Sequence, residues 1–157
     1  MAENKYIEFS HKVSDIFDEA ARVSAFTAKN IRTNDGVPLL SDFALTEDEK
    51  DIFNQGLQTI VNDISNSLVK ILYTDTEQTP DTENITFKII DNECYNENLV
   101  EIAKSSIKDC LVNGALMQWY KNCLHADLMK MYLEMYRASL TTLHARLFQF
   151  KRKKITV

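Results

Sequence analysis

Hydrophobic residues recur at alternating gaps of three and four positions along the first part of the chain. The stripe comprises Phe9, Val13, Ile16, Ala20, Val23, Thr27 and Ile31. This spacing predicts an amphipathic helix of about seven turns, running roughly from residue 5 to residue 32. Asn34-Asp35-Gly36 is expected to end the helix, and Val37-Pro38 then favours an extended connector over residues 37–45.

A second helix is predicted to begin at the capping box Thr46-Glu47-Asp48-Glu49. In such a box the threonine hydroxyl accepts a backbone N–H while the glutamate reaches back, and acids suit the positive end of the helix dipole. A second stripe carries this helix to about Tyr73; it consists of Phe53, Leu57, Ile60, Ile64, Leu68 and Ile71. The polar segment TDTEQTPDTEN that follows is typical of a loop.

Residues 85–90 alternate between hydrophobic and polar side chains and form the one strand that the sequence predicts. Ile85, Phe87 and Ile89 share one of its faces. A single strand leaves its backbone groups unpaired, so it requires a partner. The 37–45 connector could supply that partner, or this strand could pair with the sheet edge of a neighbouring subunit.

Two further helices complete the expected fold. The third, over residues 96–122 with Asn96 as its cap, is apolar almost all round between residues 107 and 120, which is typical of a centrally buried helix, and Gly114 would let another helix approach closely. The fourth follows a turn near residues 122–126. Its heptad-like seam serves as core or as a subunit interface and consists of Met129, Leu133, Tyr136, Leu140, Leu143 and Leu147, with Phe150 beyond them.

The predicted fold class is therefore mainly α. We expect a four-helix bundle-like single domain over residues 1–150, with one short β-strand and an extended basic C-terminal tail over residues 151–157. The composition agrees: 45% hydrophobic content excludes wholesale disorder, and 3 Gly and 2 Pro in 157 residues are too few for a turn-rich all-β fold.

Charge divides the chain into an acidic body and a basic end. The whole chain carries −5 and residues 146–157 carry five cations and no acid, so the first 145 residues carry −10. A general nucleic-acid binder would show a basic face across the domain. The basic end instead suggests a local docking element, and its candidate residues are Phe148, Phe150, Lys151, Arg152, Lys153, Lys154 and Ile155. A disordered solubilising tail and a nuclear-localisation signal remain the alternatives.

No residue set suggests catalysis, a metal site or a cofactor. His11, His125 and His144 fall on different elements without a nucleophile, base and orienting group. Cys110 and Cys123 belong to an apolar helix, and Cys94 has no basic neighbour in sequence to favour a thiolate. The acids around Asp48 lack the spacing and glycine of a calcium loop. An odd cysteine count, without a signal peptide or a membrane-spanning run, suggests a reducing cytoplasm.

The order of these elements resembles the small helical head-to-tail connector proteins, the neck or ring adaptors, of tailed bacteriophages. The likeness is greatest to those of gut Bacteroidetes phages, including the crAss-like group. It rests on the first helix, the link LLSDFALTEDEKDIF into an acid-started helix, the strand ITFKII, a buried helix ending in ALMQWY, and a last helix running into LFQFKRKK. The tail departs from related Arg-rich, proline-containing tails, because it reads KRKKITV.

This resemblance implies a structural virion protein rather than an enzyme. It implies a homo-oligomeric ring, typically dodecameric, that is assembled in the host cytoplasm. The ring would stand in the neck between the portal protein and other ring proteins of the tail, and genome DNA would pass through it without specific binding. A cytoplasmic helical regulatory or adaptor module, acting as a small oligomer, is the second interpretation. A small helical enzyme using Cys94 or a histidine is the third.

Overall fold

A computed structural model describes residues 6–30, 35–36, 44–73, 82–91 and 97–149, which form a mainly helical single domain. The described elements follow one another as β1 (Tyr6–Lys12), α1 (Val13–Asn30), the short 3₁₀ turn η1 (Glu47–Glu49), α3 (Lys50–Ser67), β2 (Asn84–Ile90), α4 (Glu97–Asn122) and α5 (Ala126–Gln149). The mainly α fold with four helices is thereby confirmed. The predicted tail, residues 151–157, lies outside the described residues.

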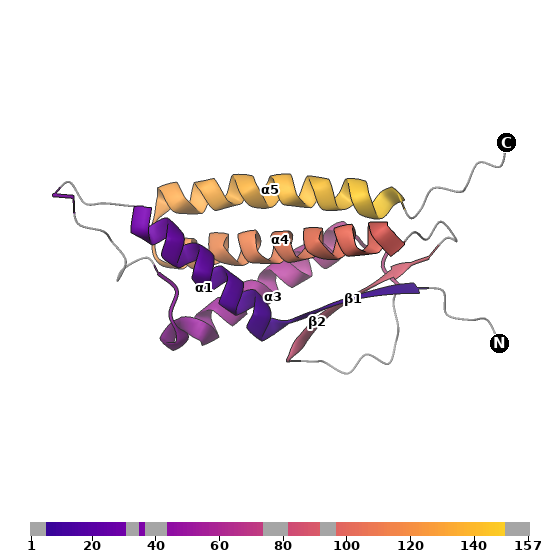
Figure 1. The fold of residues 1–157 in the computed structure, drawn as a ribbon, viewed down its shortest axis with the longest axis horizontal. Helices are drawn as coiled ribbons and strands as arrows, with labels where there is room; N and C mark the ends of the chain where they lie inside the picture. The colour runs from indigo at the N-terminus through magenta and orange to yellow at the C-terminus, as the bar shows by residue number, and fades with distance from the viewer. Residues whose placement is uncertain (1–5, 31–34, 37–43, 74–81, 92–96, 150–157) are drawn as a thin grey trace.

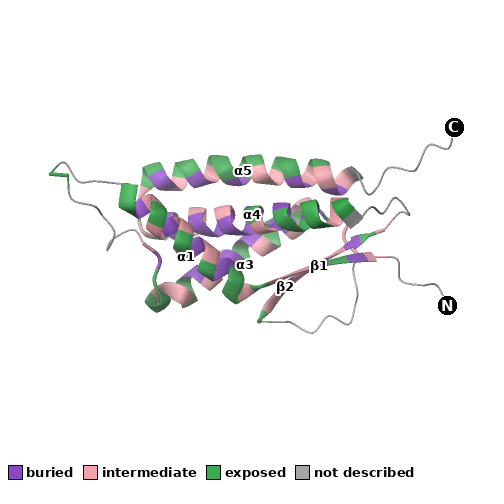
Figure 2. Ribbon diagram, viewed as in Figure 1, coloured by how far each residue is buried: buried purple, intermediate pink, exposed green. Residues whose placement is uncertain are grey.

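Helix α4 is the centre of the molecule and contacts each of the other three helices. It runs antiparallel to α5 along most of its length, while α1 and α3 cross it from the opposite side (Figure 1). Buried residues recur along this helix (Figure 2), and they include Ala103, Ile107, Cys110, Leu111, Ala115, Leu116, Trp119 and Tyr120. The sequence prediction of a central, almost wholly apolar helix is therefore confirmed.

Helices α3 and α4 cross at two glycines. A Cβ on Gly114 would lie 2.7 Å from Cγ2 of Ile60, and a Cβ on Gly56 would lie 3.0 Å from Cβ of Gln118. Each glycine therefore faces a side chain of the other helix, one turn from that helix's own glycine. Glycine inside a helix costs about 1 kcal/mol relative to alanine, so close packing at the crossing has to offset that loss.

The second helix begins as its capping box predicted. The backbone N–H of Thr46 donates to Oε2 of Glu49 at 2.9 Å, which is the reach-back half of the motif. Just before it, the backbone N–H of Leu45 donates to the buried hydroxyl of Ser24 in α1 at 2.9 Å. The start of this helix is thus attached to α1 through a buried polar contact.

Buried tyrosines connect α5 to the other helices. The rings of Tyr120 and Tyr132 stack with centroids 5.4 Å apart, and the hydroxyl of Tyr132 lies 2.8 Å from that of Thr27 in α1. Tyr136 donates its O–H to Asp63 in α3 at 2.5 Å. Tyr132 and Tyr136 therefore bury their rings in the core while each phenol oxygen keeps a polar partner on a different helix.

The predicted first helix is wrong over its first residues, which form β1. This strand pairs antiparallel with β2, with Ile7 opposite Ile89 and Phe9 opposite Phe87. Hydrophobic and polar residues alternate in YIEFSHK, so this segment fits a strand period as well as a helix period. The segment forms a strand because it pairs with β2.

The prediction of one short strand is likewise corrected to two. The partner of the 85–90 segment is β1, and neither the 37–45 connector nor a neighbouring subunit has to fill that place. Residues 37–43 lie outside the described part of the chain. The other edge of β2 is used as well: Ile90 donates its N–H to the carbonyl of Ile71 at 2.9 Å, and Tyr73 donates to Lys88 at 2.8 Å.

Replacing Gly114 with alanine should destabilise the protein although alanine favours helix. We expect Gly114→Ala to lower the free energy of unfolding by about 1–2 kcal/mol, because the added methyl overlaps Ile60 in the core. Ile60→Ala alone should cost about 2–5 kcal/mol. The double variant should lose less than the sum, because the new methyl occupies vacated space. Urea titration measures all three, and a more stable Gly114→Ala variant would contradict the tight crossing.

Stability should fall at alkaline pH. Burial raises the pKa of Cys110 to about 12 and raises the pKa values of Tyr120, Tyr132 and Tyr136 above the usual tyrosine value. The folded protein therefore keeps protons that the unfolded chain releases near pH 8.5 for a thiol and about 10 for a phenol. We expect a constant urea midpoint between about pH 7 and 8 and a progressive fall above about pH 9. Tyr136→Phe should make this fall shallower; a midpoint that stays constant to about pH 11 would contradict it.

Candidate interaction surfaces

Each of the three histidines makes a hydrogen bond within the fold. The Nε2 atom of His11 lies 3.1 Å from the carbonyl oxygen of Lys104, and burial lowers the pKa of this histidine. His125 accepts the backbone N–H of Leu128 at 3.1 Å and so caps the start of α5. His144 lies 3.1 Å from a serine hydroxyl of α3. The three imidazoles have separate partners, and the structure does not bring them together.

The described cysteines are poor nucleophiles. Burial, with a contribution from the charge of Asp109, raises the pKa of Cys110 to about 12. Burial also raises the pKa of Cys123, and the charge of Glu49 adds to that effect. Both thiols are therefore protonated at neutral pH, and a thiolate is the form that reacts or binds metal. Cys94 lies outside the described residues, and within the described ranges no three His, Cys, Asp or Glu side chains gather as metal ligands.

The predicted seam of α5 contributes mainly to the core of the single chain. Tyr136, Leu143 and Leu147 are buried, while Met129 and Leu140 are partly buried and pack against the core. Leu133 is half-buried. Most of this seam therefore packs into the core of the single chain. A partner would have to bind another side of α5.

The predicted edge-pairing residues also face inward. Ile85, Phe87 and Ile89 are buried, and the backbone of their strand is paired with β1 and, at its end, with residues 71–73. Among the predicted docking-tail residues, Phe148 is half-buried against the core. The others, Phe150, Lys151, Arg152, Lys153, Lys154 and Ile155, lie outside the described part of the chain. Among the described residues, none of the helices has the length and hydrophobicity that crossing a lipid bilayer requires.

Large hydrophobic side chains remain exposed on several sides of the domain. The most exposed are Leu124, at 91%, Phe26, at 68%, and Val69, at 65%. They belong to the α4–α5 turn, to α1 and to the end of α3. Met131 and Met135, one turn apart on α5, are exposed to 40% and 43%. Sequence patterns missed these positions, because each lies within or beside a helix whose other face forms the core.

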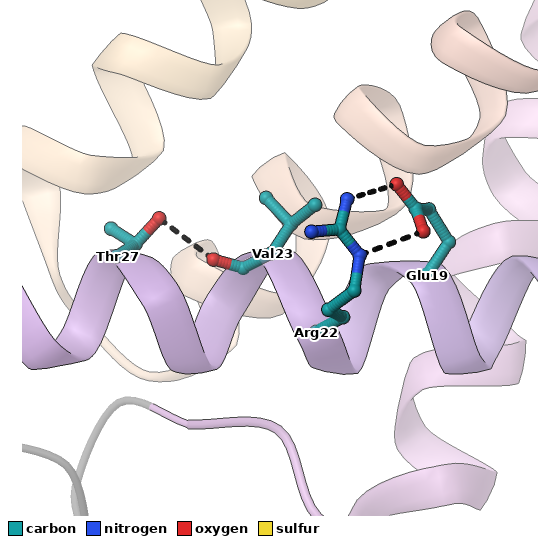
Figure 3. A network of polar contacts seen from close by, with 4 residues as sticks. All are labelled: Glu19, Arg22, Val23 and Thr27. Atoms are coloured by element: carbon teal, nitrogen blue, oxygen red, sulfur yellow. Dashed lines mark hydrogen bonds and ion pairs between the residues drawn. The ribbon is translucent and has the colours of Figure 1, made fainter.

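A groove of about 540 Å³ opens where α1, α4 and α5 meet. Its lining consists of Glu19, Val23, Lys108, Asp109, Val112, Asn113, Met135 and Ser139. On the α1 side, Arg22 makes two contacts with Glu19, from Nη2 to Oε1 at 2.7 Å and from Nε to Oε2 at 3.1 Å. Figure 3 shows that these two side chains and Val23 project from the same side of α1. The α1 wall of the groove is thus apolar at Val23, and the ion pair between Glu19 and Arg22 lies beside this valine.

A smaller depression of about 230 Å³ shares Asp109 and Ser139 with this groove and extends along α4 and α5. Arg146 lines its far end and donates a hydrogen bond to the hydroxyl of Ser106. The amide of Asn113 donates to the hydroxyl of Ser139 at 3.0 Å, which joins the two helices at the floor. Together the two depressions form a polar-rimmed trough on one face of the molecule.

The turn between α4 and α5 is the most unusual backbone feature. Leu124 has φ of +56°, and among the residues that the structure describes no other non-glycine residue has a positive φ. Its N–H donates to the carbonyl of Lys121, and the N–H of His125 donates to that of Tyr120, which together make a Schellman motif. Glycine normally takes the left-handed position of this motif. Here a leucine takes it, and its side chain is turned into solvent.

No protein-family model matches the chain, and comparison with curated proteins and with solved structures found no significant match. The resemblance to phage connectors therefore rests on the order of the sequence elements.

Proposed function

We propose that this protein is a structural virion component that forms a closed ring in the neck of a tailed phage, between the portal and the tail. The observation that carries the proposal is the distribution of exposed hydrophobic side chains. Phe26, Val69 and Leu124 lie on different elements, and each is exposed by more than half. Single exposed hydrophobic side chains also occur in monomers, but three of them on different elements would allow one copy to contact more than one neighbouring copy.

Ring closure requires two different surfaces on each copy. In a twofold dimer the same patch meets itself, whereas in a cyclic ring one patch meets a different patch on the next copy. The projecting α4–α5 turn and the trough between α1, α4 and α5 differ in shape and in residues. A pair of unlike, complementary surfaces supports a ring more than it supports a twofold dimer.

The charge distribution supports passage of DNA through such a ring. The body of the chain is acidic, with −10 over its first 145 residues because the last twelve carry +5 of a total of −5. Carboxylates repel phosphates, so an acidic lumen would let DNA slide without adhering. The basic end of the chain would then contact an acidic surface on an adjacent ring. This arrangement uses the protein for assembly and involves no chemical reaction.

The purified chain should assemble into a ring of many copies, alone or when mixed with the products of neighbouring genes. Native mass spectrometry would give the number of copies, and negative-stain images would show the central opening. A large ring would support the proposal. A monomer or dimer that binds none of these products would overturn it and favour the small regulatory module.

The basic tail should be needed for contact with the adjacent ring and not for folding. We expect serine at Lys151, Arg152, Lys153 and Lys154 to leave Tm unchanged and to weaken binding of the adjacent ring protein by tenfold or more, with binding that weakens as salt increases. A matched control removes four exposed cations elsewhere; it replaces Lys29, Lys70, Lys130 and Arg137 with serine. Equal losses in the two variants, in a cosedimentation assay, would show that net charge rather than the tail decides binding.

A further inference from the structure

The α4–α5 turn presents a leucine that the chain itself does not use. Leu124 is 91% exposed, so its side chain adds little to the core. Its φ of +56° lies in the left-handed region, where a Cβ clashes with the following carbonyl. Glycine or asparagine at this position would make the same turn with less strain. A strained, exposed leucine therefore suggests a use outside the single chain.

The turn around this leucine is rigid. Two backbone hydrogen bonds close the Schellman motif, and His125 caps the start of α5 through the N–H of Leu128. The ring of His125 also lies against that of Tyr120, with centroids 6.4 Å apart. Because the turn is held on both sides, the backbone that carries the leucine is fixed, and little backbone freedom would be lost when a partner binds it.

The trough between α1, α4 and α5 has the matching properties. Val23, Val112 and Met135 supply its apolar surface, and polar side chains surround them. The larger of its two depressions has a volume of about 540 Å³, which is more than one leucine side chain requires, so residues beside the leucine could enter with it. An apolar floor with a polar rim is the usual form of a protein-binding site.

Charge adds a second complementarity. Glu49, the last of the three acids of η1, stands near Cys123 at the α4–α5 turn, since its charge helps to raise the pKa of that thiol. In the trough, two cations, Lys108 and Arg146, stand against Asp109, while Arg22 beside the groove pairs with the carboxylate of Glu19. An acidic end would thus meet a surface with a slight positive excess, which favours the correct orientation of two copies.

We propose that Leu124 of one copy inserts into the trough formed by Glu19, Val23, Val112 and Met135 of the next copy. The inference rests on the proposed ring, because a protruding turn that enters a different surface makes a heterologous contact that can close into a ring. The occupant of the trough is therefore a second copy of this chain. The apolar contact supplies the affinity, and the acidic end selects the direction.

Two pairs of variants test the contact. Leu124→Gly removes the side chain and relieves the backbone, so Tm should rise by about 2–4 °C while association between copies weakens about tenfold to a hundredfold. Met135→Lys places a charge in the trough and should weaken association similarly. Met131→Lys is the matched control: this methionine is equally exposed one turn away but does not line the trough, so its variant should assemble normally.

Sedimentation velocity over a concentration series would measure association, and thermal unfolding would confirm that each variant is folded. A wild-type ring that Leu124→Gly or Met135→Lys leaves intact would overturn this contact, while the ring itself would stand. Equal loss in Met131→Lys and Met135→Lys would also overturn it, because the trough would then not be the specific site. A wild-type chain that never associates, alone or with the neighbouring gene products, would overturn both the contact and the proposed function.

Discussion

The close crossing of α3 and α4 is the constraint on which the rest of the structure depends. Ile60 fills the space that a side chain at position 114 would need, and the two helices can approach because Gly114 has no side chain. Two polar contacts between α3 and α5 rely on the resulting spacing, Asp63 with Tyr136 and a serine hydroxyl with His144. Hydrogen bonds weaken quickly with distance, so a wider crossing would lose both.

The same crossing sets the position of the sheet. Helix α3 ends at Ser67, and residues 71–73 pair with the outer edge of β2 directly afterwards. A displacement of α3 would therefore be transmitted to β2 and, through it, to β1. The helices and the sheet are packed as one unit, which agrees with a single domain.

The elements that could be predicted from the sequence are those that nearby residues determine. The capping box at Thr46, the apolar helix around Gly114 and the stripe of α5 all depend on residues within a few turns of one another, and the structure has them as expected. The prediction of a helix where β1 forms was wrong for a physical reason. Its hydrophobic positions suit a helix and a strand alike, and the choice depends on β2, whose Thr86 contacts Ser10 across 76 positions. Local periodicity carries no information about such a partner.

The candidate surfaces were less predictable than the fold. The seam of α5 could be core or interface from the sequence, and burial of Tyr136, Leu143 and Leu147 assigns those residues to the core. The trough could not be predicted, because Val23, Val112 and Met135 come from three helices and meet only in the packed domain. For Leu124 the sequence contains a weak indication of a role outside folding. A leucine in the short link KNCLHAD, where a glycine would be ordinary, is the kind of local mismatch that marks a position used for something besides folding.

The pairing of β1 with β2 has a consequence for synthesis of the chain. At about 5–20 residues per second, a ribosome needs roughly 4–17 s to pass from Tyr6 to Ile90, the outermost pair of the sheet. For that time the first strand has no native partner, and its alternating side chains can sample the helix that its spacing also allows. Newly made chains therefore carry an unpaired β-forming segment beside many identical copies on the same messenger RNA. The polar residues on the other face of this strand, Glu8, Ser10 and Lys12, are of the kind that disfavours aggregation of such a segment.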